Sequence, residues 1–303
     1  MLFVAIKCER MKKYRMLIGG EWLNALNDEW IESINPFTAS PWALIPRGGK
    51  ENVTRAVTAA KKAFYSSEWR GLTPSARGAV WKPSEFSSVS ALVFGELFAK
   101  AGFPPGVVNI VTGYGNEVGE SLVTHPDVAK VAFTGGDRTG EHIYQLAARG
   151  IKHVTLELGG KSANIVFDDA DLDQAVNGVV SGIFAATGQT CIAGSRALIH
   201  RPIHDAFVER LVALAKTARM DNPLELSTQV GPITTRPQYE KILDYIRIAK
   251  EEGAVCRLGG GPARRLECGA GWFVEPTVFT EVRPTMRVAN GRDLWARSFD
   301  YSL

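Results

Sequence analysis

Glu157 and Cys191 are the residues of this chain whose types and settings best suit chemistry. Glu157 belongs to the sequence Leu-Glu-Leu-Gly-Gly-Lys at residues 156–161, and Cys191 ends Gly-Gln-Thr-Cys at residues 188–191. A carboxylate among apolar residues and glycines loses hydration, which raises its proton affinity and suits it to act as a general base. Cysteine becomes a strong nucleophile once it is a thiolate. Together the two motifs predict covalent acyl chemistry.

Each of these residues also has an ordinary structural explanation. A glutamate at the end of a strand can simply pair with a lysine, and a free cysteine is more often a small buried hydrophobic residue. The Gly-Gln-Thr turn ahead of Cys191 is compatible with the catalytic interpretation, because flexible backbone there lets amide hydrogens point toward a developing oxyanion. Taken alone, the turn does not decide between the two.

Two further motifs have the residue types expected around a nucleotide. In Lys-Pro-Ser-Glu at residues 82–85, Lys82 could bind ribose hydroxyls or phosphate while Glu85 accepts from a 2′-hydroxyl. Phe-Thr-Gly-Gly at residues 133–136 follows an expected strand, and its glycines let the backbone approach a pyrophosphate closely. The alternatives are an exposed ion pair, which contributes little, and a strand-to-helix turn that binds no ligand.

We expect no metal site. His200 and His204 stand four residues apart, but no acidic or sulfur ligand with suitable spacing accompanies them, and two histidines do not complete a zinc site. The four cysteines form no regular framework and no CxxC pair, which favours a reducing cytoplasm. They are Cys8, Cys191, Cys256 and Cys268.

The composition is that of a soluble globular protein, with 45% hydrophobic and 22% charged residues. The formal net charge is +3, from 35 basic and 32 acidic residues, and no basic run is long enough to follow a phosphate backbone. No segment approaches the roughly 20 apolar residues that a spanning helix needs, and the apolar residues 1–6 are too few for a signal-peptide core. We therefore expect neither a nucleic-acid partner nor a membrane.

The elements that must position these motifs alternate between strand and helix from residue 82 onward, which predicts an α/β protein with a largely parallel sheet. Strands are expected at residues 107–111, 128–133, 153–158 and 164–167. Helices are expected at residues 83–97, 118–123, 137–149, 168–183, 207–214 and 237–253.

The first eighty residues follow a different pattern. Trp22 and Trp30 flank an expected hairpin, and residues 53–65 form an expected helix with an alanine-rich face. Residues 71–81 have no periodicity, so we interpret them as a seam between two stretches of regular pattern.

The chain resembles the aldehyde dehydrogenase superfamily through these motifs taken in order: residues 82–85, 133–135, 156–161 and 188–191. Gly-Pro at residues 231–232 and Trp-Phe-Val-Glu-Pro-Thr at residues 272–277 also look like that family. The resemblance runs from residue 16 to residue 282 with one interruption, and the glutamate and cysteine signatures rarely occur together by chance.

The resemblance implies an NAD-dependent oxidation of a small or medium aldehyde to its carboxylic acid. Cys191 would attack the aldehyde carbonyl to give a thiohemiacetal, which passes hydride to a nicotinamide and becomes a thioester. Glu157 would then activate the water that releases the acid. NAD is favoured over NADP because Glu85 would repel a 2′-phosphate. The cofactor-binding residues implied in this way are Lys82, Ser84, Glu85, Gly115, Phe133, Thr134, Gly135, Gly136 and Leu158.

The same resemblance implies a doubly wound α/β NAD-binding domain and part of an α/β catalytic domain of aldehyde dehydrogenase type. We expect the NAD-binding domain at residues 1–158, with the seam near residues 71–81. The catalytic domain is expected at residues 159–289, and residues 290–303 form an unmatched tail.

The chain also departs from the family pattern. A segment with a Pro-Trp-Asn signature, whose asparagine supplies one of two oxyanion donors, is absent ahead of Trp81, and losing one such donor costs about 10²–10³ in rate. After residue 282 no match remains to the glutamate motif that binds the nicotinamide ribose, and Gly136 stands where many relatives have serine. The family's oligomerisation elements are missing as well, which puts its usual homo-oligomer in doubt.

These departures leave a second hypothesis open, a catalytically impaired or inactive remnant of such an enzyme with at most weak nucleotide binding. Loss of central elements exposes apolar surface, and the free energy of unfolding of a protein is only about 5–15 kcal/mol.

Overall fold

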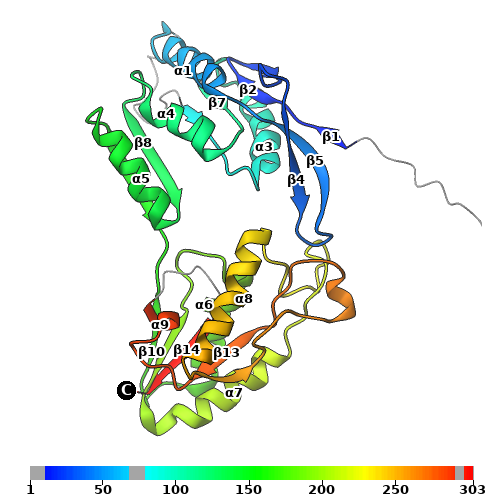
Figure 1. The fold of residues 1–303 in the computed structure, drawn as a ribbon, viewed down its shortest axis with the longest axis vertical. Coiled ribbons are helices and arrows are strands. Elements are labelled where there is room, and N and C mark those ends of the chain that lie inside the picture. The colour runs from blue at the N-terminus through cyan, green and yellow to red at the C-terminus, as the bar shows by residue number, and fades with distance from the viewer. Residues whose placement is uncertain (1–10, 68–78, 291–296, 303) are drawn as a thin grey trace, which may run out of the picture. The chain divides into compact units, whose positions relative to one another are not determined.

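The computed structural model describes residues 11–67 and 79–290, together with the backbone of residues 297–302. The chain forms two compact units, whose elements are labelled in Figure 1. Unit 1 comprises Met1–Asn35, Ser40–Thr134 and Arg138–Glu157, and unit 2 comprises Pro36–Ala39, Gly135–Asp137 and Leu158–Leu303. The two units are described separately below.

The chain up to residue 158 contains short strands around three longer helices. The strands are β1 (Lys12–Lys13), β2 (Met16–Ile18), β3 (Glu21–Leu23), β4 (Trp30–Asn35), β5 (Ser40–Pro46), β6 (Ala79–Trp81), β7 (Val108–Ile110), β8 (Lys130–Gly135) and β9 (His153–Leu158). The helices are α1 (Lys50–Phe64), α3 (Ser88–Lys100), η1 (Gly115–Gly119), α4 (Glu120–Thr124) and α5 (Asp137–Ala148).

A four-stranded sheet in the order β3-β2-β7-β6 forms the centre of unit 1. Strands β6 and β7 are parallel, whereas β2 runs antiparallel to both β3 and β7. Because successive side chains of a strand point to opposite faces, Met16 and Ile18 pack on one face with Val53 of α1. Leu17 packs on the other face with Leu92 of α3. The two helices therefore cover opposite faces of this sheet.

Strands β8 and β9 form a separate two-stranded sheet and are connected by α5. In both strands, exposed residues alternate with half-buried ones. Among the described strands each has only the other as a neighbour, so the residues of these two strands are less covered than those of a strand inside a larger sheet.

The described part of unit 2 contains five strands and seven helical segments, both long and short. The strands are β10 (Ala163–Val166), β11 (Arg196–Ile199), β12 (Val255–Leu258), β13 (Thr277–Thr280) and β14 (Arg297–Ser302). The helices are α6 (Leu172–Phe184), η2 (Ala185–Gly188), η3 (Arg201–Ile203), α7 (His204–Lys216), α8 (Arg236–Glu251), η4 (Leu266–Cys268) and α9 (Arg287–Asn290).

The five strands form one sheet in the order β10-β11-β14-β13-β12. All neighbours in it are parallel except β12 and β13. Val278 packs with residues of α6 and α7, while the next residue, Phe279, packs with residues of α8 and α9. Helices therefore cover both faces of the sheet, which is the doubly wound arrangement.

The α/β fold class predicted from the sequence is confirmed, with a largely parallel sheet in unit 2. The strand expected at residues 153–158 is found with those bounds, and the expected helix at 137–149 is α5. The hairpin expected between Trp22 and Trp30 is wrong, because β3 pairs with β2 and β4 pairs with β5. The seam at residues 71–81 lies largely outside the described residues.

One other expectation needs correction. The helix expected from residue 83 begins at Ser88, because residues 84–87 form a turn in which the Ser87 amide donates to the Ser84 carbonyl. Within the tail that lacks a family motif, residues 297–302 form the strand β14 between β11 and β13. Among the described helices, none has the length and apolar character needed to cross a bilayer.

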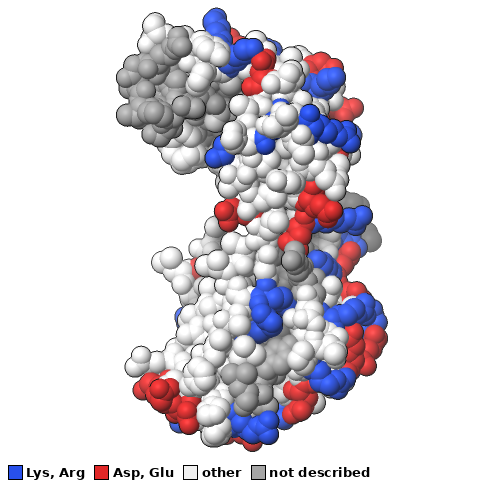
Figure 2. All heavy atoms as spheres, turned by 90° about the vertical axis from the view of Figure 1, so that its left-hand side faces the viewer, with Lys and Arg blue, Asp and Glu red and all other residues white. Residues whose placement is uncertain are grey.

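In Figure 2 basic and acidic side chains lie next to one another where they occur, and much of the remaining surface in that view is uncharged.

Candidate active site

Cys191 lies on an exposed loop that follows α6 and η2 in unit 2. The Asp171 side chain caps α6 by accepting a hydrogen bond from the Gln174 amide at 2.9 Å, and the helix buries Val176, Val179 and Ile183. The helix therefore fixes the start of the loop. Of the three described cysteines, Cys191 is exposed, whereas Cys268 is buried and burial raises the pKa of its thiol.

The turn immediately before Cys191 has left-handed backbone at three successive residues. Ala186 has φ 47° and ψ 32°, Thr187 has φ 57° and ψ 30°, and Gly188 has φ 69°. Left-handed backbone costs an L-residue roughly 1–2 kcal/mol, and a β-branched residue such as threonine adopts it rarely. Such strain persists only where surrounding contacts hold it.

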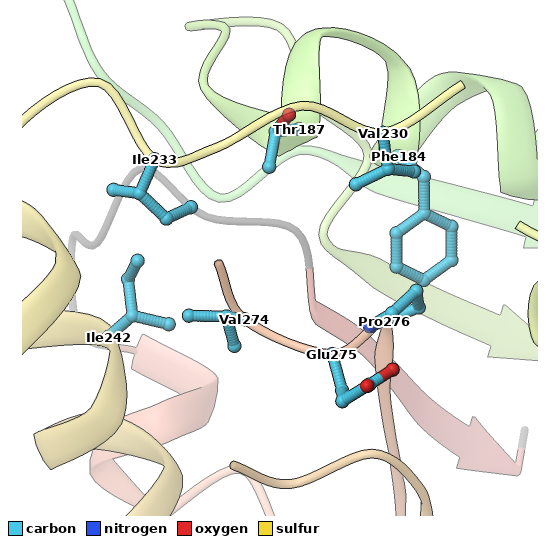
Figure 3. Close-up of a pocket in the computed structure, with 8 residues that line it drawn as sticks. All are labelled: Phe184, Thr187, Val230, Ile233, Ile242, Val274, Glu275 and Pro276. Atoms are coloured by element: carbon cyan, nitrogen blue, oxygen red, sulfur yellow. The ribbon is translucent and has the colours of Figure 1, made fainter. Parts of the chain in front are cut away.

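The contacts that hold this turn come from residues 231–234. The Thr187 hydroxyl donates to the Gly231 carbonyl at 3.2 Å. The Gln189 Oε1 accepts from both the backbone amide and the hydroxyl of Thr234, at 2.9 and 2.7 Å. Figure 3 shows Thr187 beside the chain that runs between Val230 and Ile233.

The loop is also fixed on its other side. The Gly194 amide donates to the Gly182 carbonyl of α6 at 3.2 Å, and the Asn164 side chain donates to the Gly194 carbonyl at 2.9 Å. A Cβ at residue 194 would collide with the amide of Asn164. The exposed thiol of Cys191 thus lies between two restrained points of the chain.

The last two residues of the glutamate motif, Gly160 and Lys161, lie next to the Cys191 loop. A Cβ built on Gly160 would lie 3.8 Å from the carbonyl oxygen of Cys191. The Arg196 side chain, five residues beyond the cysteine, donates to the Lys161 carbonyl at 2.9 Å. The end of the Leu-Glu-Leu-Gly-Gly-Lys sequence is therefore packed against the Cys191 loop within unit 2.

Glu157 itself does not have the buried setting that we expected. It lies on β9, at an exposed position of the alternating pattern, so the loss of hydration inferred from its apolar neighbours in sequence is wrong. The physical reason is that β9 pairs only with β8 among the described strands. Glu157 belongs to unit 1 and Cys191 to unit 2.

The predicted ribose-binding residues lie together at the turn after β6. The Lys82 Nζ is 3.2 Å from the Glu85 carboxylate, and the two side chains are 15% and 24% exposed. The Ser84 carbonyl accepts a hydrogen bond from the Ser88 hydroxyl at 2.8 Å, which attaches the turn to the start of α3. The pair is more buried than the exposed ion pair that we considered as an alternative.

The other predicted cofactor residues are distributed over the following elements. Phe133, Thr134 and Gly135 end β8, Gly136 precedes α5, Gly115 begins η1 and Leu158 ends β9. Gly136 is exposed, and a Cβ there would meet no heavy atom within 4 Å. The backbone at this strand-to-helix turn is therefore open to a ligand.

A small pocket lies behind the left-handed turn (Figure 3). Eight residues line it: Phe184, Thr187, Val230, Ile233, Ile242, Val274, Glu275 and Pro276. Its volume of about 20 Å³ is enough for one water molecule, so it is too small to hold an aldehyde.

Glu275 at the wall of this pocket forms an ion pair with Arg265. The Arg265 Nε and Nη2 donate to the two carboxylate oxygens of Glu275, at 3.0 and 2.6 Å, and its Nη1 donates to the Ala218 carbonyl at 3.0 Å. The carboxylate raises the pKa of Arg265. The Arg265 guanidinium is therefore held by a carboxylate and by a backbone carbonyl.

Comparison with known proteins gives matches along most of the chain. The model of the aldehyde dehydrogenase family matches residues 22–81 and 78–291. Betaine aldehyde dehydrogenase of Mesorhizobium japonicum is 48% identical over 223 residues, which are 73% of this chain and 46% of that protein. The chloroplastic betaine aldehyde dehydrogenase of Beta vulgaris is 45% identical over 210 residues, 69% of this chain and 42% of that protein. The chain thus spans less than half the length of these curated relatives.

Solved structures share the fold. Betaine aldehyde dehydrogenase from Staphylococcus aureus in complex with NAD⁺ has a TM-score of 0.92 and 27% identity, covering 96% of this chain and 78% of that one. The NAD⁺ complex of aldehyde dehydrogenase from Bacillus cereus has a TM-score of 0.90 and 30% identity, covering 96% of this chain and 80% of that one. The fold, the family match and the motifs agree, and this chain belongs to the aldehyde dehydrogenase family.

Proposed function

We propose that this chain oxidises an aldehyde to the carboxylic acid with NAD, through a covalent adduct on Cys191. The observation that carries the proposal is that the end of the glutamate motif lies at the cysteine loop: a Cβ added to Gly160 would be 3.8 Å from the Cys191 carbonyl oxygen, and Arg196 donates to the Lys161 carbonyl at 2.9 Å. The exposure of the Cys191 thiol supports it, since a nucleophile must be accessible.

Cys191 has the first role in the proposed reaction. Its thiolate sulfur forms a bond to the aldehyde carbon, and the carbonyl oxygen takes up a proton to give a thiohemiacetal. Loss of hydride from the carbon of this adduct, and of the proton from its hydroxyl, leaves a thioester on Cys191. Glu157 then takes a proton from water, the hydroxide adds to the thioester carbon, and the Cys191 thiolate leaves as the acid is released. One aldehyde and one water thereby give one acid, with one hydride and one proton released.

NAD would supply the acceptor for that hydride. The residues present fit it at two places: the half-buried Lys82 and Glu85 pair suits ribose hydroxyls, and the open backbone at Gly136 before α5 suits a diphosphate. Glu85 would repel a 2′-phosphate, so we propose NAD over NADP. The complexes of the related Staphylococcus aureus and Bacillus cereus enzymes with NAD⁺ support this choice.

Betaine aldehyde is the first substrate to test, because the relatives from Mesorhizobium japonicum and Beta vulgaris are named for it. Purified chain is mixed with NAD and betaine aldehyde, and NADH formation is followed by absorbance. We expect turnover in the wild type and none in Cys191→Ala. Turnover that survives in Cys191→Ala would contradict the proposed nucleophile.

Glu157→Gln separates the two halves of the reaction. The thioester should form but hydrolyse slowly, so we expect a burst of NADH followed by a slow phase, with the acyl group visible in the intact mass of the protein. Glu141→Gln, which changes an exposed glutamate on α5, is the matched control and should behave as the wild type. A Glu157→Gln enzyme with unchanged steady-state turnover would exclude this carboxylate as the base.

An impaired or inactive remnant is the second candidate function, and one observation favours it. The family match falls into two pieces that meet at residues 78–81, directly at β6, whose outer edge has no neighbour among the described strands. Absence of NADH formation by wild-type chain, with a cooperative unfolding transition that shows the chain to be folded, would select this candidate.

A further inference from the structure

The strained turn before Cys191 is attached to a single short segment, residues 231–234, which we call the anchor segment. The Thr187 hydroxyl binds Gly231 at 3.2 Å, and Gln189 binds Pro232 at 3.4 Å and Thr234 at 2.7 and 2.9 Å. These contacts join residues more than forty positions apart in the sequence. They offer a direct way to hold left-handed backbone at Ala186 and Thr187.

Gln189 uses both ends of its amide in this attachment. Its Nε2 donates to the Pro232 carbonyl, while its Oε1 accepts two hydrogen bonds from Thr234. An amide supplies both a donor and an acceptor in one plane. A carboxylate at this position would keep the acceptor and lose the donor, and alanine would lose both.

The anchor segment is itself tied to the core of unit 2. Ile233 is 2% exposed and packs with Ile242 and Ile246 of α8. Its backbone amide donates to the Trp272 carbonyl at 2.8 Å. The core therefore fixes the position of the anchor segment. The hydrogen bonds of Gln189 to this segment in turn fix the loop two residues before Cys191.

We propose that Gln189, through its hydrogen bonds to Thr234, is a positioning residue for the Cys191 thiol. The proposal rests on the proposed function, because it assigns Gln189 a role in presenting the nucleophile. Without these hydrogen bonds, Ala186 and Thr187 are free to leave the left-handed region that L-residues disfavour. The Cys191 thiol is then no longer held in one position, and its reactivity toward an alkylating reagent approaches that of a thiol in the unfolded chain.

The test measures alkylation of Cys191 by iodoacetamide as a function of pH, by mass spectrometry of the peptide that carries it. Urea-unfolded wild-type chain gives the reference profile. In folded Gln189→Ala we expect the alkylation rate of Cys191 to differ from that of folded wild type by on the order of threefold or more. The change should be in the direction of the rate measured for the urea-unfolded chain. Gln174→Ala changes an exposed glutamine on α6 and should retain the wild-type profile.

Thr234 supplies the second arm of the test. Thr234→Val removes the hydroxyl but keeps the backbone amide that binds Gln189. Its alkylation rate should therefore change in the same direction as that of Gln189→Ala, but by less. The double variant should equal Gln189→Ala alone, because the two side chains act through one interaction. Thr234→Ser should restore the wild-type profile. Since Thr234→Val is the milder change, it also serves if Gln189→Ala does not fold.

Steady-state kinetics provide a second readout. Misplacement of a reacting group lowers the rate of the chemical step, so kcat of Gln189→Ala should fall by about tenfold or more while the KM for NAD stays at the wild-type value.

An alkylation profile of Gln189→Ala that coincides with that of the wild type overturns the proposal, as do additive effects of the two substitutions. A wild-type chain that forms no NADH but shows the coupled alkylation effects refutes the proposed function and leaves the positioning role in place.

Discussion

Glu117 forms an ion pair with Arg47 that lowers the pKa of its carboxylate. The Arg47 Nε donates to it at 3.0 Å, and a second guanidinium nitrogen binds the other carboxylate oxygen. These hydrogen bonds lower the pKa of Glu117. The pair connects the residue that follows β5 to η1, and Arg47 also contacts Glu29 at 3.1 Å. A folded-state pKa below that of the unfolded chain makes this contact a source of pH-dependent stability.

We expect Glu117→Gln to lower the free energy of unfolding at neutral pH. An unfolded glutamate has a pKa near 4.3, and the folded value is lower. The stabilisation is therefore complete above about pH 4.3 and is lost as the pH falls through the folded pKa. Denaturant titrations of wild type and variant at several pH values should give curves that converge only in acid. Glu51→Gln, at an exposed position of α1, is the control, and a wild-type to Glu117→Gln difference independent of pH would contradict the assignment.

At the scale of single residues, the sequence identified Cys191 by its turn but could not identify what holds that turn. Gln189 is part of the Gly-Gln-Thr-Cys sequence. Its partner Thr234 lies two residues after the Gly-Pro of residues 231–232, but nothing in that motif indicates a contact with Gln189. The ion pair of Arg265 with Glu275 is likewise not indicated by the sequence, because its partners stand ten positions apart and meet across a loop. For Glu157 the sequence predicted burial that the structure does not have, because the apolar residues next to it along the chain do not cover its side chain.

At the scale of elements, α6 positions the cysteine loop, and its N-terminus depends on Asp171. The Asp171 carboxylate accepts from the Gln174 amide at 2.9 Å, which satisfies one of the free backbone donors at the start of the helix. We expect Asp171→Ala to lower the free energy of unfolding of unit 2 by about 0.5–2 kcal/mol. Denaturant unfolding followed by circular dichroism measures the change.

Asp169→Ala is the matched control for this prediction, because Asp169 is an exposed aspartate two residues before the cap. It should have little effect on the free energy of unfolding. Equal losses in the two variants would show that the overall charge near the helix, and not the cap, is responsible.

The helix at α6 was predictable because its signals are local: an acidic cluster at the start and apolar residues at helical spacing. Strand pairing was not, as β2 to β5 show, since a strand selects its neighbour by contacts that sequence spacing does not reveal. β14 is the clearest case. Residues 297–302 carried no recognisable motif, yet they pair with both β11 and β13.

At the scale of the whole molecule, the family match and the sheets of unit 1 break at the same place. The two matched stretches meet at residues 78–81, and β6, at residues 79–81, has β7 as its one neighbour among the described strands. The seam expected at residues 71–81 from the loss of periodicity ends in this region. Two-stranded pairing of β8 with β9 leaves those strands without the larger sheet that a doubly wound fold builds.

Each unit nevertheless has its own core, and this predicts how the chain unfolds. Leu92 is 1% exposed in the core of unit 1, and Phe207 is fully buried in the core of unit 2. Replacement by alanine should cost about 2–5 kcal/mol at Leu92 and about 3–5 kcal/mol at Phe207. Because the cores share no residues, we expect two transitions in calorimetry, with Leu92→Ala lowering the Tm of one and Phe207→Ala lowering that of the other. One transition lowered by both variants would show instead that the two units unfold together, as a single cooperative structure.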